Sequence, residues 1–463
     1  MPLQKNQVLT LRVERLSSDG SGVAHSPDGE AVFIPGAAPG DEARVRIVKD
    51  CKRYAFGILD EVLTPSPDRI PVDCAVAGPC GGCSLRHLDY AAELRAKQEN
   101  VADAFARIGG LDVPVLPIVG SPEVNRYRNK VQFPVGVDKS GKPCIGFYAG
   151  RTHRIVPCPD CRLQPGVLNE IGNALCAFFA EKGIQPYSEE TGRGLVRHIF
   201  LRRGAHSGQI MVCLVCTRAK LPSAEELCTR LKAQFAEITT ILLNVNAKNT
   251  NVILGTETHT LYGPGYIEDT LCGVPVQLGP LSFYQVNTLA AEQLYGIAAQ
   301  YAQLTPDDLL LDLYCGMGTI GLSMAAHCRE LIGVEIVPEA IESAKANAAR
   351  MGADVAAKSR FFCADAGQAA TRLAAEGLHP DIVMLDPPRK GCDEATLSAV
   401  VRMSPRRAVY VSCNPATAAR DAAWLEQNGY HAEKVQPVDL FPRTRHVEVC
   451  SSYILSLIHI SEP

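Results

Sequence analysis

The stretch Asp312-Leu313-Tyr314-Cys315-Gly316-Met317-Gly318-Thr319 decides the fold of the second half of the chain. It begins in an apolar run, Leu309–Leu313, and continues through two glycines into a helical pattern. A buried strand that leads through a glycine-rich turn into a helix is typical of nucleotide-binding α/β folds, because glycines let backbone N–H groups approach a ligand closely. Further strand patterns at Glu330–Val334, Ile382–Leu385 and Ala408–Val411 alternate with helical ones. This alternation predicts a parallel, doubly wound sheet.

Polar side chains follow the ends of these strands, where such sheets bind their ligands. Tyr314 lies in the glycine-rich turn, and Glu335 ends the next strand, where a carboxylate can accept hydrogen bonds from both hydroxyls of a ribose. Asp365 follows Phe361–Ala364 and lies where an adenine amino group is commonly met. These positions predict a site for an adenosyl cofactor, although a solvated strand end would also explain Glu335.

Asp386-Pro387-Pro388-Arg389-Lys390-Gly391 closes the next strand pattern. Prolines restrict the backbone, so this loop can hold the Asp386 carboxylate and a basic side chain toward the reacting groups. A proline-terminated strand without a function is the simpler interpretation. Amine methyltransferases use an acid-Pro-Pro loop usually followed by an aromatic residue, whereas Arg389 stands at that position here. Asp386 is therefore a predicted site residue, and amine methylation is an alternative.

A thiol lies at the end of the last strand pattern, in Tyr410-Val411-Ser412-Cys413-Asn414-Pro415. A cysteine at a strand end is more often structural, but a thiol beside a methyl donor suits one task. An amine or hydroxyl acceptor has its own lone pair, whereas an electron-poor ring carbon must first be made nucleophilic, which a thiolate adduct achieves. Cys413 is therefore the predicted nucleophile for carbon methylation. Glu448 is the predicted base, and His446 is the alternative base or a positioning residue.

The chain has 463 residues, of which 46% are hydrophobic, enough for three domains of ordinary size. Its formal net charge is -4, but residues 126–203 contain 13 lysines and arginines against 6 acidic residues, so one region is basic. The sequence shows no run of about 18 apolar residues and no signal-peptide pattern, so we expect a soluble, cytoplasmic protein. The 18 cysteines should then be reduced thiols, most of them in the core.

Three domains and a short tail are expected from the patterning. Residues 1–62 alternate in short runs split by turn signals, as in a small OB-like β-barrel. Residues 63–265 mix strand and helix patterns and carry the basic residues, which indicates an α+β domain; its helix pattern at about 90–108 is expected to pack on the catalytic domain. Residues 266–455 form the α/β domain. Residues 456–463 fit no element and are interpreted as non-native.

A cysteine cluster marks the start of the central domain. Cys74 and the group Cys80-Gly81-Gly82-Cys83 place three thiols in one loop, and Cys158 and Cys161 supply further candidates. Four thiolates suit either a cubane iron-sulfur cluster or tetrahedral zinc, and the spacing alone does not choose between them. The gap after Cys74 is too long for the Cys-x3-Cys-x2-Cys pattern of radical enzymes.

Together these residues resemble the RNA uracil-C5 methyltransferases, which make 5-methyluridine. The resemblance covers nearly the whole chain and is carried by Phe283-x-Gln285-x-Asn287, Asp312–Thr319, Asp386-Pro-Pro-Arg-x-Gly391, Ser412-Cys413-Asn414 and His446-Val-Glu448. It implies a Rossmann-like domain that depends on S-adenosylmethionine (SAM), with cofactor contacts from Gln285, Tyr314, Glu335 and Asp386. It also implies that Cys413 adds to C6 of the uracil and that Glu448 removes the C5 proton.

The cysteine pattern is similar to the branch of this family that carries a [4Fe-4S] cluster, with zinc as the alternative metal. The resemblance implies Cys161 as the fourth ligand beside Cys74, Cys80 and Cys83, which leaves Cys158 spare. Because separate residues are available for the chemistry, the cluster would have a structural and RNA-binding role.

The N-terminal barrel resembles the TRAM domain, an RNA-binding module, and the branch that has both this barrel and the cluster commonly acts on 23S rRNA. We therefore expect a monomer that acts on 23S rRNA and does not bind membranes. Arg126-Tyr127-Arg128-Asn129-Lys130 alternates cations with an aromatic ring, which suits phosphate contacts and base stacking, although a solvated charged strand would look the same. Similar contacts are expected from Phe33, Lys52, Arg53, Tyr54, Arg193, Arg197, Arg202 and Arg203.

Three other functions fit parts of the sequence. A tRNA uracil-C5 methyltransferase would use the same chemistry on another RNA. An amine methyltransferase would use the Asp386 loop without the thiol, and a non-catalytic iron-sulfur protein would only bind RNA.

Overall fold

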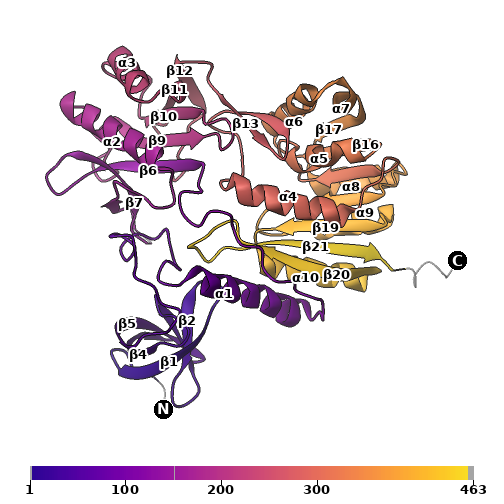
Figure 1. Ribbon diagram of the computed structural model, residues 1–463, viewed down its shortest axis with the longest axis horizontal. Helices are drawn as coiled ribbons and strands as arrows, with labels where there is room; N and C mark the ends of the chain where they lie inside the picture. The colour runs from indigo at the N-terminus through magenta and orange to yellow at the C-terminus, as the bar shows by residue number, and fades with distance from the viewer. Residues whose placement is uncertain (1–2, 151, 457–463) are drawn as a thin grey trace. The chain divides into compact units, whose positions relative to one another are not determined.

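The computed structural model, drawn as a ribbon in Figure 1, describes residues 3–150 and 152–456. These residues group into two compact units. The barrel unit comprises residues 3–124, 388–391 and 411–456; the two-sheet unit comprises residues 125–150, 152–387 and 392–410. The expected non-native tail lies, from residue 457 on, outside the described residues. The division into three domains stays a prediction.

A closed five-stranded barrel in the order β1-β2-β3-β5-β4 begins the barrel unit. Its strands are β1 (Val8–Leu16), β2 (Ser21–His25), β3 (Ala31–Pro35), β4 (Glu42–Asp50) and β5 (Tyr54–Thr64). Alternate residues face a small apolar core that includes Val13, Val32, Ile34, Val45 and Ile47. Gly57 is required inside β5, because a Cβ there would lie 2.3 Å from Cγ1 of Val45. The predicted N-terminal β-barrel is confirmed.

The rest of the barrel unit brings an early helix together with the last elements of the chain. Helix α1 (Tyr90–Asp103) begins at Asp89, whose carboxylate accepts the N–H of Ala92, and it continues as the π-helix η1 (Ala104–Gly109). These helices contact α10 (Pro415–Gln427), and α1 also contacts β20 (Tyr430–Val438). β20 forms an antiparallel hairpin with β21 (Glu448–Leu455).

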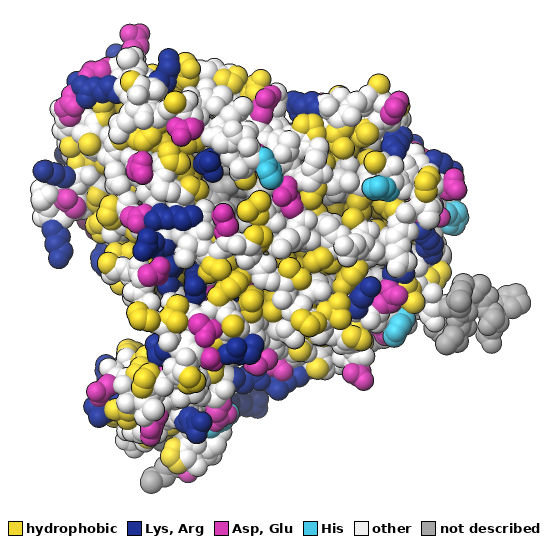
Figure 2. All heavy atoms as spheres, in the orientation of Figure 1, with side chains coloured by type: hydrophobic (Ala, Val, Ile, Leu, Met, Phe, Trp, Pro, Cys, Tyr) yellow, Lys and Arg dark blue, Asp and Glu magenta, His cyan; other side chains and the backbone are white. Residues whose placement is uncertain are grey.

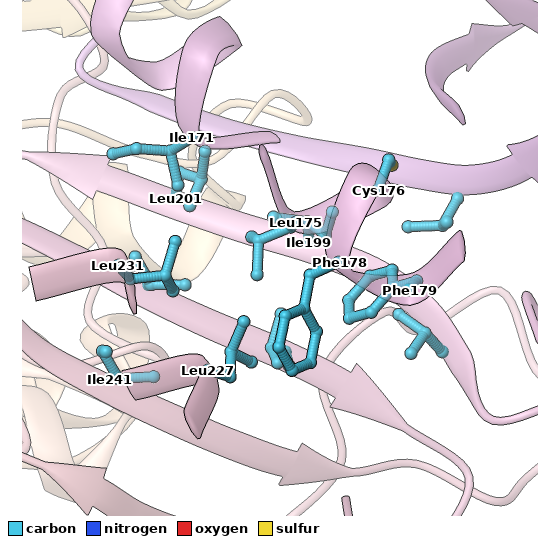
Figure 3. Packing of buried hydrophobic residues seen from close by; sticks show 14 of the residues in the cluster. Ile171, Leu175, Cys176, Phe178, Phe179, Ile199, Leu201, Leu227, Leu231 and Ile241 are labelled. Atoms are coloured by element: carbon cyan, nitrogen blue, oxygen red, sulfur yellow. The ribbon is translucent and has the colours of Figure 1, made fainter. Parts of the chain in front are cut away.

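The first sheet of the two-sheet unit has seven strands in the order β12-β11-β10-β9-β6-β7-β8. They are β6 (Lys130–Val137), β7 (Pro143–Tyr148), β8 (Ile155–Pro157), β9 (Val196–Arg203), β10 (Ile210–Cys216), β11 (Ile238–Val245) and β12 (Glu257–Tyr262). Helices α2 (Gly166–Glu181) and α3 (Ala224–Gln234) pack against it, and Figure 3 shows Phe178 and Phe179 of α2 in the shared core with Ile199 of β9. Val131 of β6 belongs to this core, so Lys130 faces away from the helices.

The second sheet of this unit contains the parallel strands β17-β16-β15-β18-β19. They are β15 (Leu309–Leu313), β16 (Glu330–Glu335), β17 (Ser359–Cys363), β18 (Ile382–Leu385) and β19 (Arg407–Ser412). The connecting helices are α5 (Thr319–Met324), α6 (Pro338–Met351), α7 (Ala353–Lys358), α8 (Ala366–Ala375) and α9 (Glu394–Met403), with the short η2 (Ala325–His327) after α5. A hairpin of β13 (Ile267–Leu271) and β14 (Val274–Leu278), followed by α4 (Thr288–Ala302), precedes the sheet. The predicted parallel α/β architecture is confirmed.

Within residues 3–150 and 152–456, no helix has both the length and the apolar character needed to cross a bilayer.

Candidate active site

The glycine-rich turn after β15 has a backbone that few other residues would tolerate. Tyr314, Gly316 and Gly318 have φ angles of 65°, 56° and 78°, all in the left-handed region. A Cβ at Gly318 would lie 3.1 Å from Cβ of Ala344, so the turn also packs too closely for a larger residue. The N–H of Gly316 donates to Oε2 of Glu335 at 3.2 Å. The turn is therefore tied to the end of the neighbouring strand.

Glu335 is fixed at the end of β16 by three backbone N–H groups. Besides the bond from the turn, its Oε1 accepts the N–H of Ile336 at 2.9 Å and that of Val337 at 3.0 Å. These bonds orient the carboxylate at the carboxyl end of a parallel strand. A carboxylate held there is suited to accept hydrogen bonds from ribose hydroxyls.

Three carboxylates influence one another around this turn. Burial, and then the charges of Asp386 and Glu335, raise the pKa of Asp312 to about 8, although the N–H of Gly321 donates to its Oδ2 at 3.0 Å. Burial and the charge of Glu335 raise the pKa of Asp386 to about 7. No lysine, arginine or histidine among the described residues forms an ion pair with any of the three. The turn is thus an acidic environment that favours a cationic ligand.

Gln285 is held beside the turn by two partners. The side chain of Asn129 donates to the main-chain oxygen of Gln285 at 2.7 Å and to Oγ1 of Thr288 at 2.9 Å. The side chain of Gln285 hydrogen-bonds to the buried Tyr295 of α4, whose hydroxyl lies 3.4 Å from Oγ1 of Thr319. Sequence reasoning missed Tyr295, because its position in α4 shows only an ordinary apolar helical pattern.

Two other predicted cofactor residues have partners of their own. The Tyr314 hydroxyl lies 3.2 Å from Oγ1 of Thr396, and burial raises the pKa of this tyrosine. Asp365 caps α8 and accepts the N–H of Gln368 at 3.1 Å. The cap explains this aspartate structurally, so its contact with adenine stays a prediction.

Cys413 lies between the end of β19 and the start of α10, and its side chain is half-buried. The next residue, Asn414, caps α10 and also donates from its side chain to the main-chain oxygen of Arg389 at 3.0 Å. Gly391 closes the same loop with φ 78°, and a Cβ there would lie 2.5 Å from a nitrogen of Arg420. The second half of the Asp-Pro-Pro loop is therefore attached to the helix that follows the thiol.

Glu448 is the first residue of β21, where it pairs with Val438 and is 5% exposed. His446 is half-buried and presents its ring edge-on to Phe441, with ring centroids 6.0 Å apart. Glu448 and Cys413 both belong to the barrel unit, whereas the predicted cofactor residues all belong to the two-sheet unit.

The chemistry of the predicted metal ligands fits a metal, because all of them are reduced thiols. A hydrogen bond from Cys158, together with N–H groups of Leu163 and Gln164, lowers the pKa of Cys161 to about 6 despite its burial. The thiolate, which is the metal-binding form, is thereby favoured at neutral pH. In the described part of the chain, however, no three side chains of His, Cys, Asp or Glu are gathered as ligands of one ion. A metal site therefore stays a prediction.

A parallel sheet with this turn and these acidic strand ends defines the class: the C-terminal part has the fold of SAM-dependent methyltransferases. Two matches to family models identify the family. Residues 207–455 match the model of the tRNA (uracil-5-)-methyltransferases, and residues 2–59 match the TRAM domain. The chain belongs to this family and is an RNA (uracil-5-)-methyltransferase.

Relatives and a solved structure agree with this assignment. The chain is 43% identical to an uncharacterized RNA methyltransferase of Halalkalibacterium halodurans over 96% of its own length and 97% of the relative's. It is 41% identical to one of Oceanobacillus iheyensis over 98% of each chain. The crystal structure of Pyrococcus abyssi tRNA (uracil-54, C5)-methyltransferase in complex with S-adenosyl-L-homocysteine superimposes with a TM-score of 0.77, at 26% identity, over 96% of this chain and 100% of that one.

Proposed function

We propose that this protein is a SAM-dependent 23S rRNA (uracil-C5)-methyltransferase that forms 5-methyluridine through a covalent adduct of Cys413. The observation that carries the proposal is the half-buried thiol between β19 and α10, in the same unit as the buried carboxylate of Glu448. A family that methylates a uracil carbon needs such a pair, because C5 of uracil is not nucleophilic by itself.

The Cys413 thiolate adds to C6 of the uracil, and the electron pair that becomes available at C5 takes the methyl group from the sulfonium of SAM, which leaves as S-adenosylhomocysteine. Glu448 then removes the proton from C5, and the C6–S bond breaks to release the thiolate and the methylated base. His446 is the alternative base, or it positions the reacting groups.

The acidic turn would bind SAM, which carries positive charge on its sulfonium and ammonium groups. Glu335 would accept the ribose hydroxyls, and the other proposed contacts are Gln285, Tyr314, Asp365 and Asp386. S-adenosylhomocysteine in the Pyrococcus abyssi enzyme supports this assignment.

The TRAM-type barrel supports an RNA substrate. Phe33, Tyr54 and Phe56 form an aromatic group on the barrel, with ring centroids 5.6 to 5.9 Å apart, and Tyr54 and Phe56 are 40% and 36% exposed. Hydrophobic side chains lie among charged ones on the barrel surface in Figure 2. Exposed rings of this kind suit stacking with unpaired bases. The target uracil must leave its stack to reach a thiol, so a loop nucleotide is expected.

The choice of 23S rRNA rests on the barrel together with the cysteines. A [4Fe-4S] cluster held by Cys74, Cys80, Cys83 and Cys161 would support RNA binding and would supply no step of the methyl transfer; zinc is the alternative. Metal and sulfide analysis after anaerobic purification tests this, and stoichiometric zinc without iron would contradict the cluster. A tRNA substrate is the second candidate, because the Pyrococcus abyssi enzyme acts on tRNA.

Two measurements test the proposed function. RNA that contains 5-fluorouridine should trap a stable protein adduct, because no C5 proton is available for removal, and Cys413→Ala should abolish both the adduct and methylation. Substantial methylation by Cys413→Ala would favour an amine methyltransferase instead. Mass-spectrometric mapping in a deletion strain should show loss of 5-methyluridine from 23S rRNA; loss from tRNA alone would make the substrate assignment wrong, and no loss at all would favour a non-catalytic RNA-binding protein.

A further inference from the structure

Three cations lie close together at the start of β6, and no carboxylate among the described residues forms an ion pair with them. Lys130 stands directly opposite Arg202 of β9 in the antiparallel ladder, and Arg128 lies two residues before Lys130. The side chain of Lys130 is part-buried and makes no hydrogen bond or ion pair in the described part of the chain. Like charges directly opposite one another on neighbouring strands destabilise a sheet. Arg128 also lies near the thiol of Cys161, but no acidic side chain among the described residues pairs with Lys130 or Arg202, so a ligand is needed to balance this charge.

The surroundings of Arg202 do not neutralise this charge. The side chain is 1% exposed, and its two terminal nitrogens donate to the main-chain oxygens of Gly279 at 2.8 Å and Ser282 at 2.7 Å. Carbonyl oxygens accept these bonds but carry no net charge. Nε of Arg202 and Nε of Arg128 are buried without an acceptor. Burial and the charges of Arg202 and Arg128 lower the pKa of Lys130 to about 8.

The cations lie beside the segment that carries Gln285. Asn129, between Arg128 and Lys130, donates to the main chain of Gln285, and the two bonds of Arg202 reach the loop just before it. The same loop exposes Phe283, which is 72% exposed. Unbalanced cations near an exposed aromatic ring suit the binding of a nucleotide, because the cations can bind the phosphate while the base stacks on the ring.

We propose that Lys130 and Arg128 form an anion subsite that binds a phosphodiester group of the substrate RNA, and that the buried Arg202 adds positive charge to it without touching the ligand. The identity of the ligand as RNA rests on the proposed function, whereas the need for an anion follows from the unbalanced charges. A second source of the same chemistry is the carboxylate of the SAM methionine moiety. The exposed Phe283 favours RNA, and the experiment separates the two.

The test measures RNA binding by the full-length protein against salt concentration. The probe is a fluorescein-labelled 12-nucleotide oligouridylate, which reports phosphate binding whether rRNA or tRNA is the methyl acceptor. Lys130→Gln should weaken binding about three- to tenfold at low salt and lower the slope of log Kd against log salt by about 0.7, the value for one phosphate contact on a single strand. Lys130→Arg should keep the wild-type affinity and slope.

A matched control and two further measurements distinguish a phosphate contact from a role in cofactor binding or in stability. Lys345→Gln removes an exposed lysine of the same unit, paired with Glu342 at 2.8 Å, and should leave the salt slope unchanged. Lys130→Gln should bind S-adenosylhomocysteine like the wild type and should not melt at a lower temperature; Lys130→Met should behave the same.

Three results would overturn the proposal. An unchanged salt slope in Lys130→Gln would exclude a phosphate contact. A loss of S-adenosylhomocysteine binding with normal RNA binding would assign the anion to the cofactor. Lower melting temperatures in both neutral variants would make Lys130 structural. None of these depends on which RNA is methylated, so a failure of the 23S rRNA assignment would be recognised separately.

Discussion

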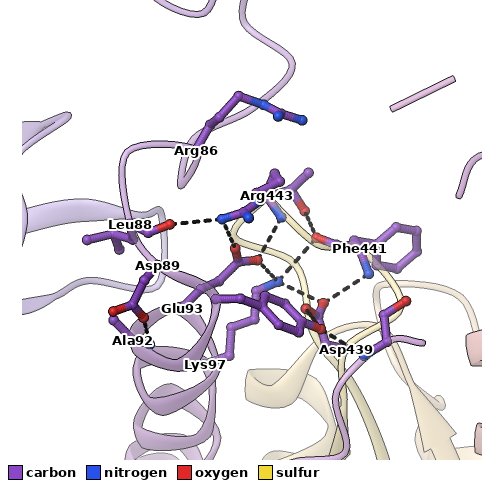
Figure 4. A network of polar contacts seen from close by, with 12 residues as sticks. Arg86, Leu88, Asp89, Ala92, Glu93, Lys97, Asp439, Phe441 and Arg443 are labelled. Atoms are coloured by element: carbon purple, nitrogen blue, oxygen red, sulfur yellow. Dashed lines mark hydrogen bonds and ion pairs between the residues drawn. The ribbon is translucent and has the colours of Figure 1, made fainter. Parts of the chain in front are cut away.

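The barrel unit and the two-sheet unit both bury charged side chains, but they balance the charges differently. In the barrel unit, Lys97 of α1 is 1% exposed and donates to Glu93 at 2.7 Å and to Asp439 at 2.8 Å (Figure 4). Arg443 adds a second cation, with a guanidinium nitrogen 3.7 Å from Glu93 and 2.8 Å from the main-chain oxygen of Leu88. Two cations face two carboxylates, so this network needs no ligand.

This balanced network connects parts of the barrel unit that lie far apart in the sequence. The N–H of Arg443, a residue with φ 69°, donates to Glu93 at 2.7 Å, and the Tyr90 hydroxyl donates to Asp439 at 3.0 Å. α1 thereby holds the segment that leads from β20 to Glu448. The charges of this network therefore have a structural role.

The two-sheet unit contains an ordinary ion pair of Asp308 with Arg406 at 2.7 Å, but two of its groups of wholly or partly buried charged side chains are separated by sign. Lys130, Arg202 and Arg128 form no ion pair with a carboxylate, although Arg128 lies near the Cys161 thiol, and Asp312 and Asp386 have no basic partner among the described residues. Burying an unbalanced charge costs folding free energy, so natural proteins mostly retain it where a ligand supplies the opposite charge. We therefore propose that the balanced group stabilises the fold, whereas the two unbalanced groups bind ligands.

The largest expected effect comes from breaking the balanced network. Lys97→Met leaves two buried carboxylates without their shared cation, and we expect the free energy of unfolding to fall by about 3–5 kcal/mol. Urea denaturation followed by circular dichroism measures this. Lys345→Met, at an exposed ion pair, should cost less than about 1 kcal/mol. If Lys97→Met cost no more than this control, the network would not be the structural element described above.

An intermediate effect is expected from the acidic turn. The pKa of Asp386 is raised to about 7 from an ordinary value of 3.8, so the folded, cofactor-free protein holds a proton that the unfolded chain loses between these pH values. Its stability should therefore fall as pH rises from about 4 to about 7.

Cofactor binding should show the opposite trend. Since a cationic ligand favours the ionised carboxylate, SAM affinity should rise with pH between about 6 and 8, by at most about tenfold per pH unit for each proton released. Calorimetry in buffers of different ionisation enthalpy counts that proton. Asp386→Asn should weaken SAM binding and flatten the pH profile; an unchanged profile would mean that Asp386 does not face the cofactor's charge.

The sequence predicts the features that depend on neighbouring residues, but it does not predict those that depend on contacts between distant segments. The strand, turn and helix around Gly316 and Gly318 follow from periodicity and glycine placement within a few residues. Gly391 was recognisable as part of a motif, but its physical reason, the close approach of Arg420, is tertiary. Lys97 and Asp439 are 342 residues apart, so the sequence around either residue does not predict that they pair.

The smallest expected effect separates the charges of the two units most clearly. Most substitutions of a buried residue lower the free energy of unfolding, whereas this one should raise it. Lys130→Gln removes one of three like charges from β6 and β9, so we expect the free energy of unfolding to rise by about 0.5 kcal/mol in the absence of RNA. Oligouridylate should stabilise the wild type more than the variant, because only the wild type retains the full anion subsite. Thermal unfolding with and without the oligonucleotide measures both quantities. If the variant were less stable than the wild type and oligouridylate stabilised both equally, Lys130 would have a structural role like that of the balanced charges in the barrel unit.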